Sequence, residues 1–200
     1  MALTYSTLQS TVMDYLDRSD LSTVVPTFVE LAESKFKRKL RHWKMEKRAT
    51  ADTVASQRTL DLPSDFLEMR SIKRNSDPTI VLEHLSPAIA DAYVSSVGAP
   101  YYFHISGTEI HFDPTPDGVY EIEMNYYGFT PLSESATTNW LLEDHPDIYL
   151  YGTLLEAEAY LMNDPRLQVW KLAFDQAMLD LNKEGKITRA GGAPLTVRYT

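Results

Sequence analysis

The sequence predicts an α+β fold, in which a helical bundle formed by both chain ends carries an inserted small antiparallel β domain. Two observations favour this class. Apolar residues recur with helical spacing near both ends of the 200-residue chain, whereas the residues from Glu46 to about Tyr127 alternate with the spacing of strands. The segment Thr138–Leu161 then returns the chain to helix. We therefore expect a discontinuous bundle from residues 1–45 and 140–185, a β domain from 46–139, and an extended C-terminal tail from 186–200.

The N-terminal part of the bundle is predicted to contain two helices. Residues 4–17 form the first helix, with Thr4 as its N-cap. The second helix begins at Pro26, because proline is favoured in the first position, and runs to about Trp43. Its apolar residues fall in one broad arc, and the opposite face carries basic residues.

The middle of the chain is predicted to form about seven short strands separated by turn residues. A hairpin is expected for Tyr101–Ser106 and Glu109–Asp113, because the two residues between them suit a tight turn that sets Phe103 opposite Phe112. Ser86–Ser95 is predicted to be a short helix. The other predicted strands are Ala49–Val54, Arg58–Leu62, Phe66–Lys73, Thr79–Glu83 and Val119–Tyr127.

The C-terminal part of the bundle is again helical. Pro146 and Asp147 suit a helix start, and Ile148–Met162 is apolar around more than half of its circumference, as expected of a helix packed on several sides. A last helix follows Asp164 as N-cap, and Gly185 is predicted to end it. These two helices are expected to form an antiparallel hairpin. The apolar stripe of the last helix comprises Trp170, Ala173, Phe174, Ala177, Met178 and Leu181.

The composition restricts the classes of function. The chain has no cysteine, which excludes disulfides and thiolate metal sites and favours assembly in a reducing cytosol. No stretch approaches the ~20 apolar residues that span a membrane, so a soluble product is expected. The net charge of −9 argues against a free-standing nucleic-acid binder. The glycine patterns of phosphate and dinucleotide sites are absent.

The charge is unevenly distributed, since eight of the 19 basic residues lie between Lys35 and Arg48. This stripe could hold DNA phosphates, an acidic partner or only water. The acidic balance of the chain disfavours DNA, and an acidic patch on a second copy fits a head-to-tail contact. The candidate residues for a subunit or portal interface are Lys35, Lys37, Arg38, Arg41 and Lys44, with Glu158 from the apolar arc of its helix and Arg189 and Arg198 from the tail.

Two groups of residues are candidates for chemistry. His104 and His111 are opposed in the predicted hairpin, with carboxylates nearby, and could hold zinc; a pair at a solvent or interface face is the simpler interpretation. The carboxylate pairs Asp144/Asp147 and Glu156/Glu158 could act as acid and base, but the first pair satisfies a helix N-terminus and Glu158 suits a salt bridge within the bundle. We therefore expect no catalytic residues, no metal and no cofactor.

Four segments together resemble the bacteriophage head-to-tail adaptor proteins, which form a ring beneath the portal at the DNA exit of the capsid. The segments are VPTFVELAESKFKRKLR, RTLDLPSDFLEMRSI, GAPYYFHISGTEIHFDPTP and TNWLLEDHPDIYLYGTLLEAEAYL, the last followed by a helix with Trp170 and a glycine-rich tail. The similarity covers nearly the whole chain in order. It implies a helical bundle with an inserted β domain, a dodecameric ring, and contact of the helical part and the tail with the portal.

The resemblance implies a structural virion protein without enzymatic activity. Such a protein docks on the portal, extends the channel through which genomic DNA passes without sequence-specific binding, and provides the attachment surface for tail proteins. It is located in the virion neck after assembly in the host cytoplasm, with no membrane involved. The alternatives are a glycan (peptidoglycan) hydrolase that uses acidic residues, since some relatives have been described with that character, and another tail or baseplate component.

Overall fold

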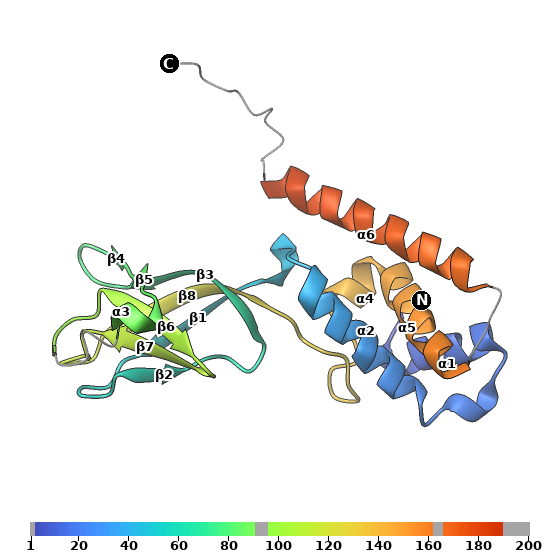
Figure 1. Cartoon of the computed structure of the whole chain (residues 1–200), viewed down its shortest axis with the longest axis horizontal. Coiled ribbons are helices and arrows are strands. Elements are labelled where there is room, and N and C mark those ends of the chain that lie inside the picture. The colour runs from blue at the N-terminus through green and yellow to red at the C-terminus, as the bar shows by residue number, and fades with distance from the viewer. Residues whose placement is uncertain (1–2, 91–95, 162–165, 190–200) are drawn as a thin grey trace, which may run out of the picture. The chain divides into compact units, whose positions relative to one another are not determined.

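The computed structural model describes residues 3–90, 96–161 and 166–189, and the chain divides into two compact units (Figure 1). The helical unit comprises Met1–Lys44 and Thr130–Thr200, and the β unit comprises Met45–Phe129. Helices at both ends and strands between them confirm the predicted α+β class. Residues 130–139, which were predicted to belong to the β domain, belong to the helical unit. The backbone N–H of Leu132 donates to Glu33, and the carbonyl of Thr137 accepts from the N–H of Tyr5.

The N-terminal helices are α1 (Tyr5–Leu16), η1 (Ser19–Leu21), α2 (Val25–Lys39) and η2 (Trp43–Met45). Thr4 is the N-cap of α1, as predicted, and exchanges hydrogen bonds with Thr7 in a capping box. Helix α2 carries Pro26 in its first turn. It ends four residues before the predicted Trp43, because Leu40 adopts an extended conformation and its N–H bonds back to the helix.

The returning chain forms α4 (Trp140–Asp144), α5 (Pro146–Leu161) and α6 (Leu167–Arg189). The predicted end of the last helix at Gly185 was wrong, and residues 186–189 are helical rather than extended. A single glycine costs a helix only about 1 kcal/mol. Gly185 also packs against His42, to whose Cδ2 an added Cβ would come within 3.0 Å. Met162 and the predicted N-cap Asp164 lie outside the described residues.

The core of the helical unit is built around α5, which packs against α1, α2, α4 and α6 (Figure 1). The ring of Phe36 on α2 meets Tyr149 edge-on at 5.2 Å and Phe174 of α6 at 6.3 Å. Gly152 lets these helices approach, since a Cβ there would lie 2.8 Å from Phe36 Cζ. Among the helices of the described ranges, none has the length and hydropathy that crossing a bilayer requires.

The β unit consists of two four-stranded sheets. One sheet has the order β1 (Glu46–Asp52), β8 (Glu121–Gly128), β3 (Phe66–Arg74), β4 (Ile80–Val81). The other has the order β2 (Thr59–Asp61), β7 (Glu109–Asp113), β6 (Tyr102–Ser106), β5 (Glu83–His84). Strand β5 pairs with β6 in parallel, so the unit is not purely antiparallel as predicted. The connection between them contains α3 (Pro87–Ala90), the described part of the helix predicted for Ser86–Ser95.

The predicted hairpin register is confirmed, with Phe103 opposite Phe112 in β6 and β7. Gly107 takes a positive φ of 61° in the turn, a conformation that favours glycine. The two sheets share one apolar core of buried residues: Ile72, Leu82, Phe103, Ile110, Phe112, Ile122, Met124 and Tyr126.

Candidate assembly interface

The predicted basic stripe lies on the second half of α2 and the residues that follow it. Cations are favourable at this end of a helix, where the unpaired carbonyl groups carry partial negative charge. Arg41 uses this directly, since its Nη1 donates to the carbonyl oxygens of Lys37 at 2.8 Å and Leu40 at 2.6 Å. Its role within the unit is therefore to cap the helix.

Two further members of the stripe are engaged in ion pairs within the helical unit. Lys35 pairs with Glu156 of α5, and Lys44 Nζ lies 2.8 Å from Asp144 Oδ2 of α4. Lys37 is partly buried and its charge acts on Glu33. The ion pairs of Lys35 and Lys44 join α2 and the residues after it to α5 and α4, so these two lysines contribute to the structure of the helical unit itself.

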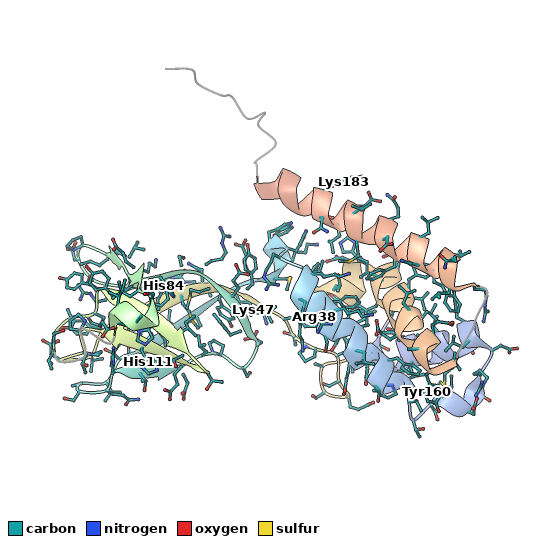
Figure 2. The ribbon with its side chains drawn as sticks, viewed as in Figure 1. Arg38, Lys47, His84, His111, Tyr160 and Lys183 are labelled. Atoms are coloured by element: carbon teal, nitrogen blue, oxygen red, sulfur yellow. The ribbon has the colours of Figure 1, made fainter. Side chains whose placement is uncertain are left out.

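Arg38 and Lys39 are the members of the basic run that stay exposed without a partner among the described residues. They are adjacent near the end of α2, where Figure 2 marks Arg38. We call them the free basic pair.

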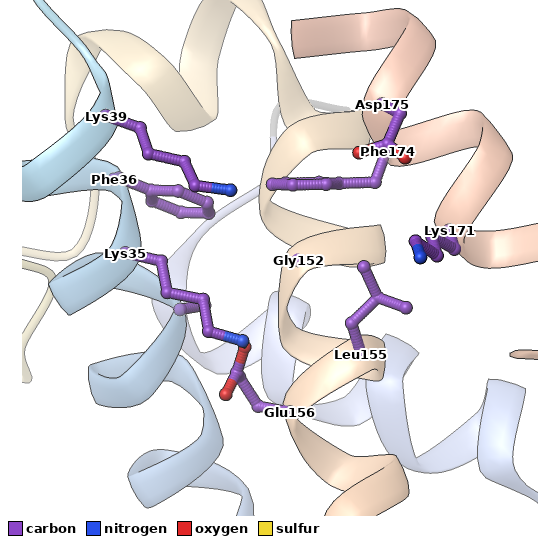
Figure 3. A pocket seen from close by; sticks show the side chains of 10 residues that line it. Lys35, Phe36, Lys39, Gly152, Leu155, Glu156, Lys171, Phe174 and Asp175 are labelled. Atoms are coloured by element: carbon purple, nitrogen blue, oxygen red, sulfur yellow. The ribbon is translucent and has the colours of Figure 1, made fainter.

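A pocket of about 280 Å³, lined by Lys39 of the free basic pair, lies between α2, α5 and α6 (Figure 3). Its apolar lining includes Phe36 and Phe174, whose rings approach across Gly152. Lysines from two helices stand around it, Lys39 from α2 and Lys171 from α6. The other lining residues are Ala32, Lys35, Leu155, Glu156 and Asp175.

The side chains that line this pocket are better suited to bind an acidic group of a partner than to catalyse a reaction. Lys35 is neutralised by Glu156, which leaves Lys39 and Lys171 facing one exposed carboxylate, Asp175. An amphipathic acidic side chain could place its apolar stem on the aromatic floor and its charge near the two amines.

The remaining predicted interface residues are dispersed. Glu158 is partly buried on α5 and has interactions of its own. Arg189 is the last residue of α6, and Arg198 lies outside the described residues. The structure therefore brings together the α2 residues of the predicted interface but does not unite them with the tail.

The histidine pair is present but forms a packed pair rather than a ligand set. The rings of His104 and His111 stack with centroids 4.8 Å apart. Burial of His104, together with the charge of His111, lowers the pKa of His104, so its imidazole is neutral at neutral pH. Its Nδ1 lies 3.5 Å from Asp113, whose other oxygen is held by Arg58 Nη2 at 2.7 Å. In the described ranges, no group of three or more metal-ligating side chains is placed to hold a metal ion.

The carboxylates considered as candidates for acid–base chemistry have structural roles in the helical unit. Asp144 and Glu156 each form an ion pair with a lysine of the basic run. Asp147 is exposed in the first turn of α5, where an anion stabilises the helix N-terminus. No pair of them converges on the pocket of Figure 3, to which Glu156 alone contributes.

Comparison with known proteins decides the family. A sequence model of the family described as SU10 adaptor protein matches residues 3–198. The chain belongs to the SU10 adaptor protein family. The comparison with curated proteins found no significant match. The family confirms the resemblance to phage head-to-tail adaptors, and it gives this adaptor a structural role in a phage.

Sequence reasoning missed a buried polar network in the helical unit of the adaptor. Glu33 of α2 is 2% exposed, and its Oε1 accepts from the Leu132 N–H at 2.7 Å and from the Tyr149 hydroxyl at 2.8 Å. Asn139 donates to the same hydroxyl at 2.6 Å and to the carbonyl of Thr130 at 2.9 Å. This network fixes residues 130–139 to the helices. The available signal was the position of Glu33 within the apolar arc of α2.

The adaptor also separates its charge between the two units. The β unit contains 13 acidic and six basic side chains, a net −7, whereas the helical unit contains 15 and 13, a net −2. The excess of acidic over basic side chains is thus concentrated in the β unit.

Proposed function

We propose that this adaptor assembles as a ring, most simply a dodecamer, that docks on the portal protein and extends the DNA channel. The ring provides the attachment surface for tail proteins and is located in the virion neck after assembly in the host cytoplasm. Membership of the adaptor family supports this role. Genomic DNA passes through the channel without sequence-specific binding, which a net charge of −9 per copy favours.

In this proposal, the free basic pair binds an acidic surface of a neighbouring copy or of a portal subunit. Arg38 and Lys39, which form no ion pair with the residues that the structure describes, add positive charge to a unit of net −2, while the other unit of every copy carries a net −7. Two unlike surfaces on one chain permit head-to-tail contacts, which close into a ring when the rotation allows it. An acidic surface on the portal would be recognised by the same charges.

The test reverses the charge of the free basic pair. The double variant Arg38→Glu/Lys39→Glu is mixed with purified portal protein, and the mass of the complex is measured by light scattering. We expect loss of ring formation or of portal docking. Arg41 is left unchanged, because its contacts to the α2 carbonyls mean that its replacement would also weaken the helix.

A matched control places glutamates elsewhere on the same unit. Arg18→Glu/Lys183→Glu changes the net charge equally at two exposed positions away from α2, and we expect it to assemble normally. Equal assembly of both double variants would contradict the role of the free basic pair. A wild-type protein that stays monomeric with portal protein would contradict the proposed function itself.

A further inference from the structure

The outer strand β1 of the β unit is an open sheet edge. Its only neighbour in the sheet is β8, among the strands of the described residues. The Thr53 N–H bonds to the Tyr120 carbonyl at 3.0 Å, which fixes the alternation of the antiparallel pair. The backbone groups of Ala49 and Ala51 therefore point to β8, and those of Arg48, Thr50 and Asp52 point away from the sheet.

This edge lacks the usual protection at its centre. Proteins commonly guard an exposed edge with charged side chains, prolines or a bulge. Strand β1 has charges near its ends but Ala49-Thr50-Ala51 in the middle, and its register with β8 runs without a bulge. A second strand can therefore pair with it.

An apolar slot of about 200 Å³ runs along the same edge, between β1 and β2. Its floor contains Ile110 and Ile122 of the unit's core, and the part of β1 that lines it, Ala49–Ala51, has only small side chains. The slot is smaller than the ~300–1,000 Å³ of a typical small-molecule site. It is of a size for one or two apolar side chains of an added strand.

The chain itself contains a segment with the matching pattern. Leu195, Val197 and Tyr199 alternate with Thr196 and Arg198, which is the pattern of a strand with one apolar face. The segment follows the end of α6 at Arg189 after a glycine-rich link, and from residue 186 onward the sequence has three basic residues and no acidic one. This charge is complementary to the net −7 of the β unit.

We propose that residues 195–199 of a neighbouring copy add as a strand to β1, with their apolar face on the side of the slot and Val197 inserted into it. The backbone groups of Arg48, Thr50 and Asp52 then gain hydrogen-bond partners. Arg198, on the other face of the added strand, lies on the side of Asp52. Because every copy offers one donor segment and one acceptor edge, the contact joins copies head to tail; in this respect the inference rests on the proposed ring.

Cysteine cross-linking tests this contact cleanly, because the chain has no cysteine of its own. One preparation carries Thr50→Cys, and a second carries Thr196→Cys or Arg198→Cys on a chain lengthened by a tag. The two are assembled together with portal protein and oxidised mildly. We expect a mixed disulfide dimer, since Cα atoms of adjacent strands lie within the ~4.4–6.8 Å that a disulfide spans.

Two matched pairs of variants test the slot. In the cross-linking background, Val197→Asp should reduce the cross-linked fraction by about tenfold or more, because it buries a charge in the slot. Its control is Thr196→Asp, which changes the opposite face of the added strand. With Arg198→Cys as the donor cysteine, this control should have little effect on the cross-linked fraction. Ala51→Leu should fill the slot and reduce the fraction likewise, whereas Ala55→Leu in the exposed turn should not.

The outcomes separate this inference from the proposed function. Assembled rings without the mixed dimer would overturn the inference and leave the ring intact as a proposal, and so would rings in which only dimers of two identical cysteine variants form. If no ring forms, the proposed function fails. The mixed dimer is then still expected in concentrated free protein, and its absence there would overturn the inference as well.

Discussion

The two units bury carboxylates in opposite ways. In the helical unit, Glu33 accepts its two hydrogen bonds from neutral donors, the Leu132 N–H and the Tyr149 hydroxyl. In the β unit, the equally buried Glu123 is paired with Arg48 and with Lys73, whose Nζ lies 3.0 Å away. Burial raises the pKa of Glu33 despite its hydrogen bonds. Burial opposes ionisation of Glu123 too, but its hydrogen bonds to Lys73 and Arg48 outweigh it and lower its pKa.

The difference reflects what each carboxylate holds in place. Glu33 is buried with its hydrogen-bond partners, which water cannot reach, and its bond to the Leu132 N–H holds residues 130–139 against α2. The partners of Glu123 are long side chains that reach in from the surface, with Arg48 64% exposed. Loss of Glu33 therefore leaves buried groups unsatisfied, whereas loss of Glu123 releases cations that water can solvate.

The largest expected effect is from Glu33→Ala. It leaves the Leu132 N–H without an acceptor inside the core, and we expect the helical unit to lose about 2–4 kcal/mol of unfolding free energy. All three tryptophans, Trp43, Trp140 and Trp170, belong to the helical unit, so urea unfolding followed by tryptophan fluorescence reports on it selectively.

Two controls sharpen this prediction. Glu33→Gln keeps an acceptor and should recover most of the loss, and Glu123→Ala should leave the tryptophan transition of the helical unit unchanged. An alanine variant at position 33 as stable as the wild type would contradict the role assigned to the buried network.

A smaller loss is expected from Gly152→Ala. The new Cβ would lie 2.8 Å from Phe36 Cζ and 3.3 Å from Phe174 Cε2, and such overpacking costs about 1–3 kcal/mol, partly offset by the better helix propensity of alanine. Gly118→Ala in the β unit meets its nearest atom only at 4.0 Å and should change stability by less than about 0.5 kcal/mol. Thermal unfolding of the two variants measures the contrast, and equal midpoints would refute it.

The pH dependence of the two units should have opposite signs. The folded-state pKa of Glu33 lies above its ordinary value of 4.5, so its contribution to stability is complete below that value and decreases as the pH rises through the raised pKa. The pKa of Glu123 lies below 4.5, so its contribution is complete above that value and is lost as the pH falls.

Amide hydrogen exchange resolved by residue measures both units in one sample. We expect Glu33→Gln to remove part of the decline of helical-unit protection with rising pH, and Glu123→Gln to remove part of the decline of β-unit protection with falling pH. If neither substitution changes how protection varies with pH, then groups other than Glu33 and Glu123 determine the pH dependence of the two units.

The smallest effect is expected at the surface. Lys44→Met removes the partly exposed ion pair with Asp144, and such pairs contribute about 0.5 kcal/mol or less. Tryptophan-monitored urea unfolding should show nearly the wild-type midpoint. A loss comparable to that of Glu33→Ala would mean that the basic run is part of the core architecture.

The sequence was sufficient for features that depend on local chemistry. Thr4 as a helix cap, Pro26 in the first turn of α2 and the register of the hairpin that sets Phe103 opposite Phe112 follow from short-range rules. Gly185 was misleading because its cost to the helix is small and His42 packs against it, a contact between residues distant in the sequence.

The candidate interface was only partly predictable for the same reason. The basic run was visible, but Arg38 and Lys39 are distinguished from Lys35 and Lys44 by partners on α4 and α5. Glu123 alternates with the apolar residues Ile122 and Met124 along β8 but is buried like them, because Arg48 and Lys73 cover it from neighbouring strands. Such long-range pairings have no local signature in the sequence.

The most direct test of the account is a cryo-microscopy reconstruction of the adaptor bound to portal protein. We predict a closed ring docked on the portal, with Arg38 and Lys39 of each copy against an acidic surface of a neighbouring copy or portal subunit. Adaptor copies bound singly, or a ring in which the free basic pair faces solvent, would contradict it.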